Sequence, residues 1–213
     1  VLSRRQRQMC IRDSITIPKN VAFSGTVTGD NNSYIKLIDQ TISTSDGTFV
    51  VNNSFINSTY DHYHIFYEVH TLTQDDVQMQ VKYYLTTNAS GDAGSIITGN
   101  NHSFGNSMIG SASEVSQNNT SSYGVIGTTE IKTNAGEGMA FNGILQNVNS
   151  TNNLVTFNGV GSLLRNANGA HNAFTFHVGM ATPATYGAYY CRGILFQLSG
   201  GQHTGKFKLY GIK

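Results

Sequence analysis

Short hydrophobic runs, each closed by Asn, Asp or Gly, are the feature that most limits the folds open to this chain. Asn, Asp and Gly tolerate the positive φ angles of tight turns, so these runs are typical of β-strands joined by turns. Alternation is clearest after residue 62, where Tyr63, Ile65 and Tyr67 share one face of a strand. We predict strands at Val21–Thr28, Ile35–Ser43, Thr48–Ile56, Tyr63–Leu72, Val77–Thr87, Tyr123–Lys132, Ala140–Val148, Leu154–Leu164, Ala173–Gly179, Ala188–Leu198 and Gly205–Tyr210.

This pattern predicts an all-β fold, an antiparallel β-sandwich resembling a jelly roll, with about ten to eleven strands. We expect two hairpins, one joining 63–72 to 77–87 and one joining 193–198 to 205–210. Phe207 and Leu209 should be core residues that face Ile194, Phe196 or Leu198. The polar stretch Ser95–Ser122 reads as a long loop with one short strand near 104–109.

Composition excludes several protein classes. Charged residues make up only 12% of the 213-residue chain, against a usual share of about 25%. The 11 Tyr and 11 Phe argue against disorder, because disordered chains carry few aromatic residues and high net charge. No apolar stretch approaches the ~18 residues of a membrane-spanning helix. The formal net charge of +1 leaves no basic patch for nucleic acid. We therefore expect no membrane insertion and no nucleic-acid partner.

The start of the chain resembles a translated sequencing-library adapter. Residues 4–14 read Arg-Arg-Gln-Arg-Gln-Met-Cys-Ile-Arg-Asp-Ser, and such a scar does not belong to the natural domain. We predict that residues 1–14 are an artefact, disordered and packed against nothing. Residues 15–213 then form a single β-sandwich domain, the C-terminal part of a longer protein. Removing four arginines and Asp13 changes the formal net charge from +1 to −2. Cys191 is then left without a disulfide partner.

Five segments, in this order, carry a resemblance to a known family. They are Ser33–Ile38, Ser58–Ile65, Asp75–Val81, Gly193–Gly201 and Gly205–Ile212. The second resembles the pattern S-T-Y-D-x-Y-x-I, and the last resembles G-x-F-x-L-Y-G-I near a chain end. The ordered set is similar to a family of bacteriophage virion structural proteins, of the tail or tail-fibre kind.

The resemblance implies a non-enzymatic structural module of a tail, fibre or capsid surface, located in the virion. Its partners would be other virion proteins and further copies of itself, a trimer for example. The family supplies no catalytic residues and no cofactor. A host-surface glycan is a further expected partner, because Asn, Ser, Thr and Tyr can hydrogen-bond sugar hydroxyls and stack on sugar rings. For this role we single out Asn101, His102, Asn118 and Asn119 in the predicted loop, and Tyr123 directly after it.

The alternative is an enzyme, either a cupin-like metalloenzyme or a glycan-active β-sandwich. His62, His64 and Glu68 have the spacing of a cupin metal motif, and His with carboxylate ligands suits Zn, Fe or Mn. The glycines that frame this motif in cupins are missing, since Ile56 and Asp75 occupy their positions. We read the trio as the polar face of a half-buried strand and expect no tightly bound metal.

Other catalytic patterns are incomplete. Ser107 lies one residue away from a G-x-S-x-G elbow and lacks its strand-to-helix context. The carboxylates Glu68, Glu130 and Glu137 have no evident partner for glycoside hydrolysis, which needs two. Gly159-Val160-Gly161 lacks the helix that a phosphate-binding loop requires. Cys191 reads as a small buried hydrophobic residue. We therefore predict that the chain is not an enzyme and needs no cofactor.

Overall fold

The computed structural model describes residues 34–43, 47–88, 93–97, 101–109, 115–131, 138–164, 171–180 and 189–213. All these residues belong to one compact unit, Asn31–Lys213. The predictions for residues 1–14 and for a strand at Val21–Thr28 lie outside the described residues.

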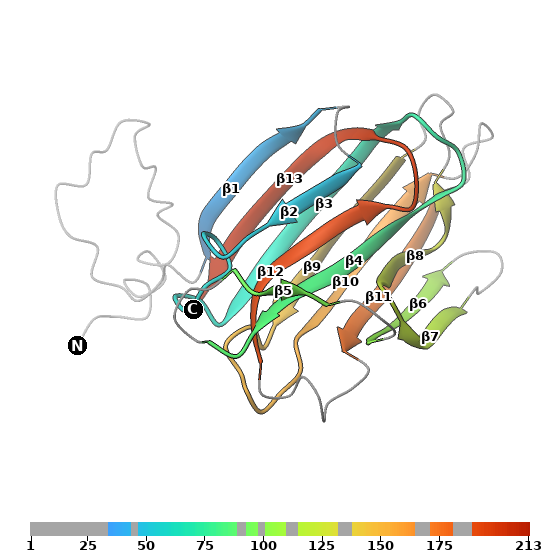
Figure 1. Ribbon diagram of the computed structural model, residues 1–213. Coiled ribbons are helices and arrows are strands. Elements are labelled where there is room, and N and C mark those ends of the chain that lie inside the picture. The colour runs from blue at the N-terminus through green and yellow to red at the C-terminus, as the bar shows by residue number, and fades with distance from the viewer. Residues whose placement is uncertain are drawn as a thin grey trace, which may run out of the picture. The chain divides into compact units, whose positions relative to one another are not determined.

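Thirteen strands make up the described part of the chain, more than the ten to eleven predicted. Figure 1 shows them in two layers. Their bounds are β1 Tyr34–Ile42, β2 Thr48–Val51, β3 His62–Leu72, β4 Val77–Thr86, β5 Ser95–Ile96, β6 His102–Ile109, β7 Val115–Ser121, β8 Gly124–Ile131, β9 Gly138–Gln146, β10 Thr156–Leu164, β11 His171–Met180, β12 Tyr190–Leu198 and β13 His203–Ile212.

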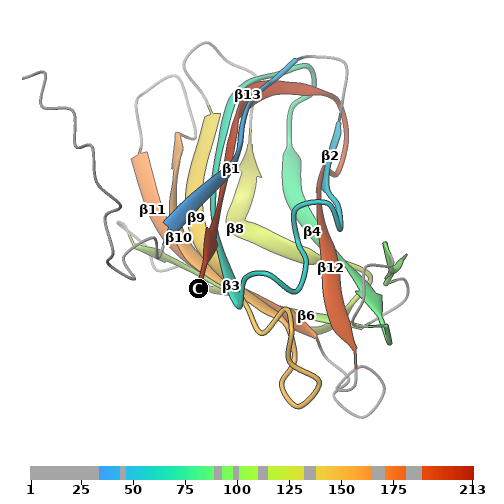
Figure 2. The same cartoon turned by 90° about the vertical axis from the view of Figure 1, so that its left-hand side faces the viewer.

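The strand order confirms the predicted jelly-roll sandwich. The larger sheet has the order β1-β13-β3-β9-β10-β11-β6-β7, and the smaller has the order β2-β12-β4-β5 with β8 also paired to β4. The antiparallel pairs β1–β13, β2–β12, β3–β9 and β4–β8 are nested, first strand with last, and alternate between the sheets. Such nesting is a long hairpin folded over on itself, which is the jelly-roll arrangement. Figure 2 shows the two sheets as separate layers.

The first predicted hairpin, between β3 and β4, is wrong. Strand β3 pairs with β13 and β9, whereas β4 pairs with β12, β5 and β8 in the other sheet. The turn at residues 73–76 crosses between the sheets, and it is tied to the turn that follows β12. Thr73 N donates to Gln202 O (3.0 Å), and Gln202 N donates to Thr73 Oγ1 (2.8 Å). Alternation shows that a strand has one buried face, but it does not show which strand lies beside it.

The second predicted hairpin, between β12 and β13, is also wrong, although its core residues are right. Strand β13 lies between β1 and β3 in the larger sheet, and β12 lies between β2 and β4 in the smaller one. Phe207 and Leu209 are fully buried, as expected. Phe207 faces Phe196 across the sandwich, with 5.9 Å between the ring centroids. The contact therefore joins the two layers and not neighbouring strands.

The stretch Ser95–Ser122, predicted as a long loop with one short strand near 104–109, contains three strands in its described part, β5, β6 and β7. Strand β6 corresponds to the predicted short strand, and β5 and β7 were not predicted. Strand β6 pairs with β11 and β7, and so extends the larger sheet. Its Asn106 is buried and joins β6 to β8: Nδ2 donates to Val125 O (3.0 Å), and Oδ1 accepts from Gly127 N (3.0 Å). A polar residue thus occupies an inward position where alternation would require an apolar one. A smaller difference is that β2 ends at Val51, short of the predicted Ile56.

The core between the layers is rich in aromatic rings. Phe196 of β12 lies 5.1 Å from Tyr67 and 6.0 Å from Phe157, measured between ring centroids. These separations fall in the range in which aromatic pairs attract. Two inward positions of β10, Gly159 and Gly161, carry no side chain because the rings of Phe176 and Phe174 occupy that space. The Gly159-Val160-Gly161 pattern is therefore explained by packing.

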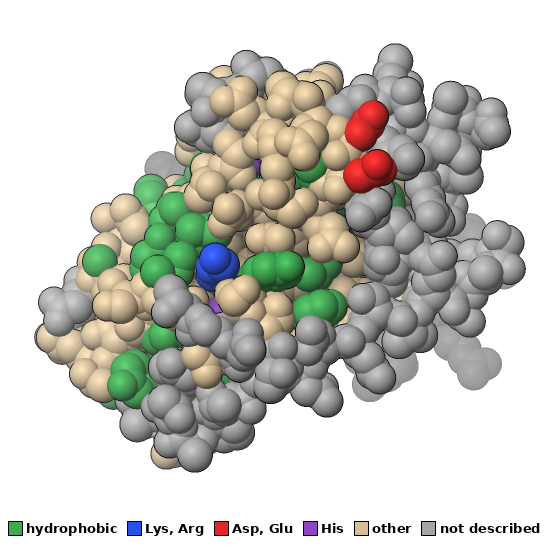
Figure 3. Space-filling view, turned by 45° about the vertical axis from the view of Figure 1, so that its right-hand side comes forward, with side chains coloured by type: hydrophobic (Ala, Val, Ile, Leu, Met, Phe, Trp, Pro, Cys, Tyr) green, Lys and Arg blue, Asp and Glu red, His purple; other side chains and the backbone are tan. Residues whose placement is uncertain are grey.

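Charged side chains are sparse on the surface seen in Figure 3, in keeping with the low charged fraction of the sequence. No helix among the described residues is long and apolar enough to cross a membrane.

Candidate binding site on the outer face of the larger sheet

The outer face of the larger sheet is where the described chain exposes aromatic side chains and shallow hollows side by side. Because side chains alternate along a strand, residues whose neighbours point into the core point outward here. Outward positions from β1 to β11 are Tyr34, Lys36, Asp39, Lys206, Lys208, Tyr210, His64, Phe66, Glu68, His70, Ala140, Asn142, Ile144, Asn158, Val160, Ser162, Ala173, Thr175 and His177.

Four of these residues form a continuous cluster of rings, which we call the aromatic cluster: Tyr34, His64, Phe66 and Tyr210. The ring centroids of His64 and Phe66 lie 4.2 Å apart, those of Phe66 and Tyr210 lie 5.8 Å apart, and Tyr34 stands edge-on to His64 at 5.8 Å. The four side chains line a hollow of about 370 Å³. Tyr34 is 53% exposed and Phe66 is 38% exposed. A contiguous set of exposed rings is typical of an interaction site.

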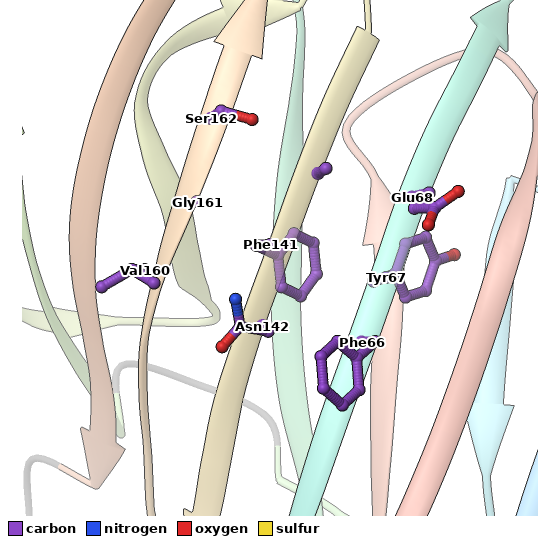
Figure 4. Close-up of a pocket in the computed structure, with 9 residues that line it drawn as sticks. Phe66, Tyr67, Glu68, Phe141, Asn142, Val160, Gly161 and Ser162 are labelled. Atoms are coloured by element: carbon purple, nitrogen blue, oxygen red, sulfur yellow. The ribbon is translucent and has the colours of Figure 1, made fainter.

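A second hollow adjoins the cluster, which we call the groove. It measures about 240 Å³, and its outward lining is Phe66, Glu68, Ala140, Asn142, Val160 and Ser162. Figure 4 shows that these side chains come from three neighbouring strands, β3, β9 and β10. Phe66 lines both hollows, so that together they run across the sheet from β1 to β10. That distance is four strand spacings, or roughly 19 Å.

Polar groups stand among the rings and interact with one another. His64 Nε2 lies 3.5 Å from Asn142 Oδ1, and His177 Nδ1 is hydrogen-bonded to Asn158 Oδ1. Glu68 is paired with His70, at 2.9 Å between the carboxylate and the ring nitrogen. The face therefore offers amide, imidazole, hydroxyl and carboxylate groups next to apolar rings. This is the mixture found in small-molecule sites, where apolar area holds the ligand and a few polar groups orient it.

The trio His62, His64 and Glu68 does not converge on one point. All three lie on the single continuous strand β3, where the six residue steps from His62 to Glu68 span roughly 20 Å. Glu68 is already paired with His70. The described residues contain no group of three or more His, Cys, Asp or Glu side chains placed to hold a metal ion. That the trio binds metal ions weakly or not at all is a prediction, to be tested by measurement.

The five residues predicted to bind a ligand are not gathered on a protruding loop. Asn101 and Tyr123 are half-buried next to the ends of β6 and β7, and Asn118 and Asn119 lie on β7, where their side chains are outside the described set. His102 is fully buried and stacks on Tyr83 of β4, with 5.8 Å between ring centroids. His102 is therefore a core residue and is not available at the surface.

Cys191, predicted as a small buried hydrophobic residue, and Ser107, the incomplete nucleophile motif, are also explained by the fold. Cys191 is buried in β12, and burial raises the pKa of its thiol to about 12, so that the thiol stays protonated at neutral pH. The adjacent Arg192 is buried as well. Its Nη1 donates to Cys191 O (2.8 Å), Asn149 Oδ1 (3.0 Å) and Val148 O (3.2 Å), which fixes the β9–β10 loop against β12. Ser107 lies within strand β6, not at a strand-to-helix turn.

The buried imidazole of His102 should make stability depend on pH. Burial lowers the pKa of His102 from 6.5 to about 4. In this pH range the unfolded chain binds a proton at His102 and the folded chain does not. The free energy of unfolding should therefore fall as the pH drops from about 6.5 to about 4. The loss expected from this residue is about 3 kcal/mol.

Urea unfolding of wild type and of His102→Phe, at pH 7.5 and pH 4.5, measures this loss. The variant should lose less stability on acidification than the wild type, because carboxylates that titrate in this range contribute equally to both proteins. Equal losses in the two proteins would contradict the assignment.

Sequence reasoning missed the aromatic cluster, because its members come from β1, β3 and β13. The one available signal was Phe66, an apolar residue on the otherwise polar face of its strand. Comparisons with family models, with curated proteins and with solved structures give no match to this chain.

Proposed function

We propose that this domain is a non-enzymatic structural module of a phage virion, part of a tail, a fibre or the capsid surface. The observation that carries the proposal is where the resembling segments lie. Ser33–Ile38, Ser58–Ile65 and Gly205–Ile212 are far apart in the sequence, yet they occupy or lead into β1, β3 and β13. These three strands are neighbours in the larger sheet, with β13 in the middle.

Three of the five segments that resemble the family thus meet on one surface, whereas Asp75–Val81 and Gly193–Gly201 lie mainly on β4 and β12 of the smaller sheet. Tyr34 and Tyr210 belong to the first and last of the five, and both line the aromatic cluster. A fold alone does not imply a function, so the proposal rests on the surface to which three of the resembling segments contribute. In this proposal the partners are other virion proteins and further copies of the chain, and the location is the virion.

Detection of the protein in phage particles tests the proposal. Antibodies raised against the recombinant domain should label particles by immunoelectron microscopy in the virus fraction of the sample that yielded the gene. Tryptic peptides that include Gly193–Lys206 should appear in the proteome of the same purified fraction. Peptides confined to the cellular fraction, with unlabelled particles, would contradict a virion role.

A further inference from the structure

We propose that the aromatic cluster and the groove together bind a neutral oligosaccharide, laid across strands β1, β13, β3, β9 and β10. This inference builds on the proposed function, in which the domain is exposed at the surface of a virion. It also moves the expected glycan contact from the 100–122 region, whose His102 is buried, to the outer face of the larger sheet.

The rings supply the apolar half of such a site. The C–H faces of a sugar ring are apolar, and they pack on exposed aromatic rings that other side chains do not cover. Phe66 and Tyr34 are 38% and 53% exposed, and Tyr210 stands between their strands on β13. Contacts between neighbouring rings hold the side chains of the cluster in place, because Phe66 touches both His64 and Tyr210. A ligand then immobilises few side chains on binding, which favours affinity.

The groove supplies the polar half. Asn142 offers both donors and an acceptor, Ser162 offers a hydroxyl, and Glu68 offers carboxylate oxygens. All three line the same hollow, next to the exposed apolar side chain of Val160. Sugar hydroxyls both donate and accept, so amide, hydroxyl and carboxylate groups beside an apolar floor match their chemistry.

The distribution of charged side chains on this face favours a neutral ligand over an acidic one. Among the described outward side chains of β9, β10 and β11 none is Asp, Glu, Lys or Arg. On β1, β13 and β3 charges of both signs are interleaved: Lys36 is bridged to Asp39 at 3.2 Å, Lys208 lies opposite Asp39 in register, and Lys206 lies opposite Glu68. A polyanion would find no positive charge there that is not interleaved with negative charge, whereas a neutral chain needs none.

A second copy of the chain is a poorer fit. A standard protein–protein interface buries about 800 Å² on each partner and has an apolar core. On this face the exposed apolar residues Phe66 and Val160 are separated by Asn142, which lies opposite both of them in register. Narrow apolar spots separated by hydrogen-bonding groups suit a thin, hydroxyl-rich chain better than a broad protein surface.

Binding to defined neutral hexasaccharides tests the inference. The recombinant chain is titrated by calorimetry with hexamers of glucose, mannose and N-acetylglucosamine in different linkages, and with hexagalacturonic acid as an acidic comparison. We expect saturable binding of at least one neutral hexamer. Phe66→Ala should weaken that binding roughly tenfold, as expected for loss of a central aromatic contact.

Phe55→Ala is the matched control, because Phe55 is 37% exposed and lies in the turn after β2, outside both hollows. It should bind as wild type does. Val160→Gln gives a second test within the groove, and its binding should weaken while its melting temperature stays near that of wild type.

Three results would overturn the inference: no binding of any neutral hexamer, equal binding by wild type and Phe66→Ala, or binding of the acidic hexamer alone. Self-association of the wild type that Phe66→Ala abolishes, without sugar binding, would assign this face to a second copy. None of these results would remove the protein from phage particles, so they are distinguishable from failure of the proposed virion role.

Discussion

A chain that lacks residues 205–213 should be insoluble or unfolded. The deletion removes most of β13, which lies between β1 and β3 in the larger sheet and pairs with both. Strands β1 and β3 would each lose the backbone hydrogen bonds that they make with β13, and the core would lose Phe207 and Leu209, which are fully buried. Circular dichroism and size-exclusion chromatography of the truncated protein provide the measurement.

A single substitution in the same strand should destabilise the fold without abolishing it. Phe207→Ala should lower the free energy of unfolding by about 3–5 kcal/mol, because it removes a ring that packs on Phe49 at 4.5 Å and on Phe196 at 5.9 Å. For a domain of this size that corresponds to a melting temperature roughly 10 °C lower.

Phe66→Ala is the matched control for this substitution. The same side chain is removed from the outer face, where Phe66 is 38% exposed, and the cost should stay under about 1 kcal/mol. A truncation that stays soluble and unfolds cooperatively, or equal costs for the two alanine variants, would disprove the central position of β13.

Replacing Asn106 by Leu should destabilise the fold by about 2–5 kcal/mol, although the two side chains are similar in size. The side-chain amide of Asn106 bonds the backbone of β8 as a neighbouring strand would: it donates to Val125 O and accepts from Gly127 N, each at 3.0 Å. Leu would leave both backbone groups buried without a partner, at the place where β8 bends through Gly127 at a φ of 88°.

Asn152→Leu, at an exposed position of the β9–β10 turn, is the comparison for Asn106→Leu. It should change stability by no more than about 0.5 kcal/mol. Chemical unfolding of both variants decides the point. If Asn106→Leu proves as stable as Asn152→Leu, the side chain does not hold β6 to β8 in solution.

Sequence reasoning found which residues face the core and missed which strands lie together. The alternation in β3 and β4 correctly predicts that Tyr63, Ile65, Val77 and Met79 are buried. It also suggested that the two strands pair, because they are adjacent in the sequence and joined by a short turn. In the structure that turn crosses the sandwich, and the two strands bury their apolar faces against each other's layer.

Strand β7 was missed, and β6 was predicted only as a short strand near 104–109, for a different reason. Asn106 of β6 faces inward, and its hydrogen bonds are made with β8, which begins eighteen positions later at Gly124. A polar inward residue breaks the alternation that marks a strand. The reason for the polar residue is visible only once the strand to which it hydrogen-bonds is known. The same holds for Gly159 and Gly161, whose missing side chains make room for Phe176 and Phe174 of the next strand.

The sequence by itself determined the all-β class, the layered architecture and the buried faces of the clearest strands, because burial of one strand face leaves a period of two that is visible locally. Only the tertiary structure decided the neighbours of each strand, and with them the candidate binding site. Tyr34, Phe66 and Tyr210 are each unremarkable where they stand in the sequence. They form a site because β13 returns from the chain end to lie between β1 and β3, and contacts between such distant segments leave no periodic trace in any one of them.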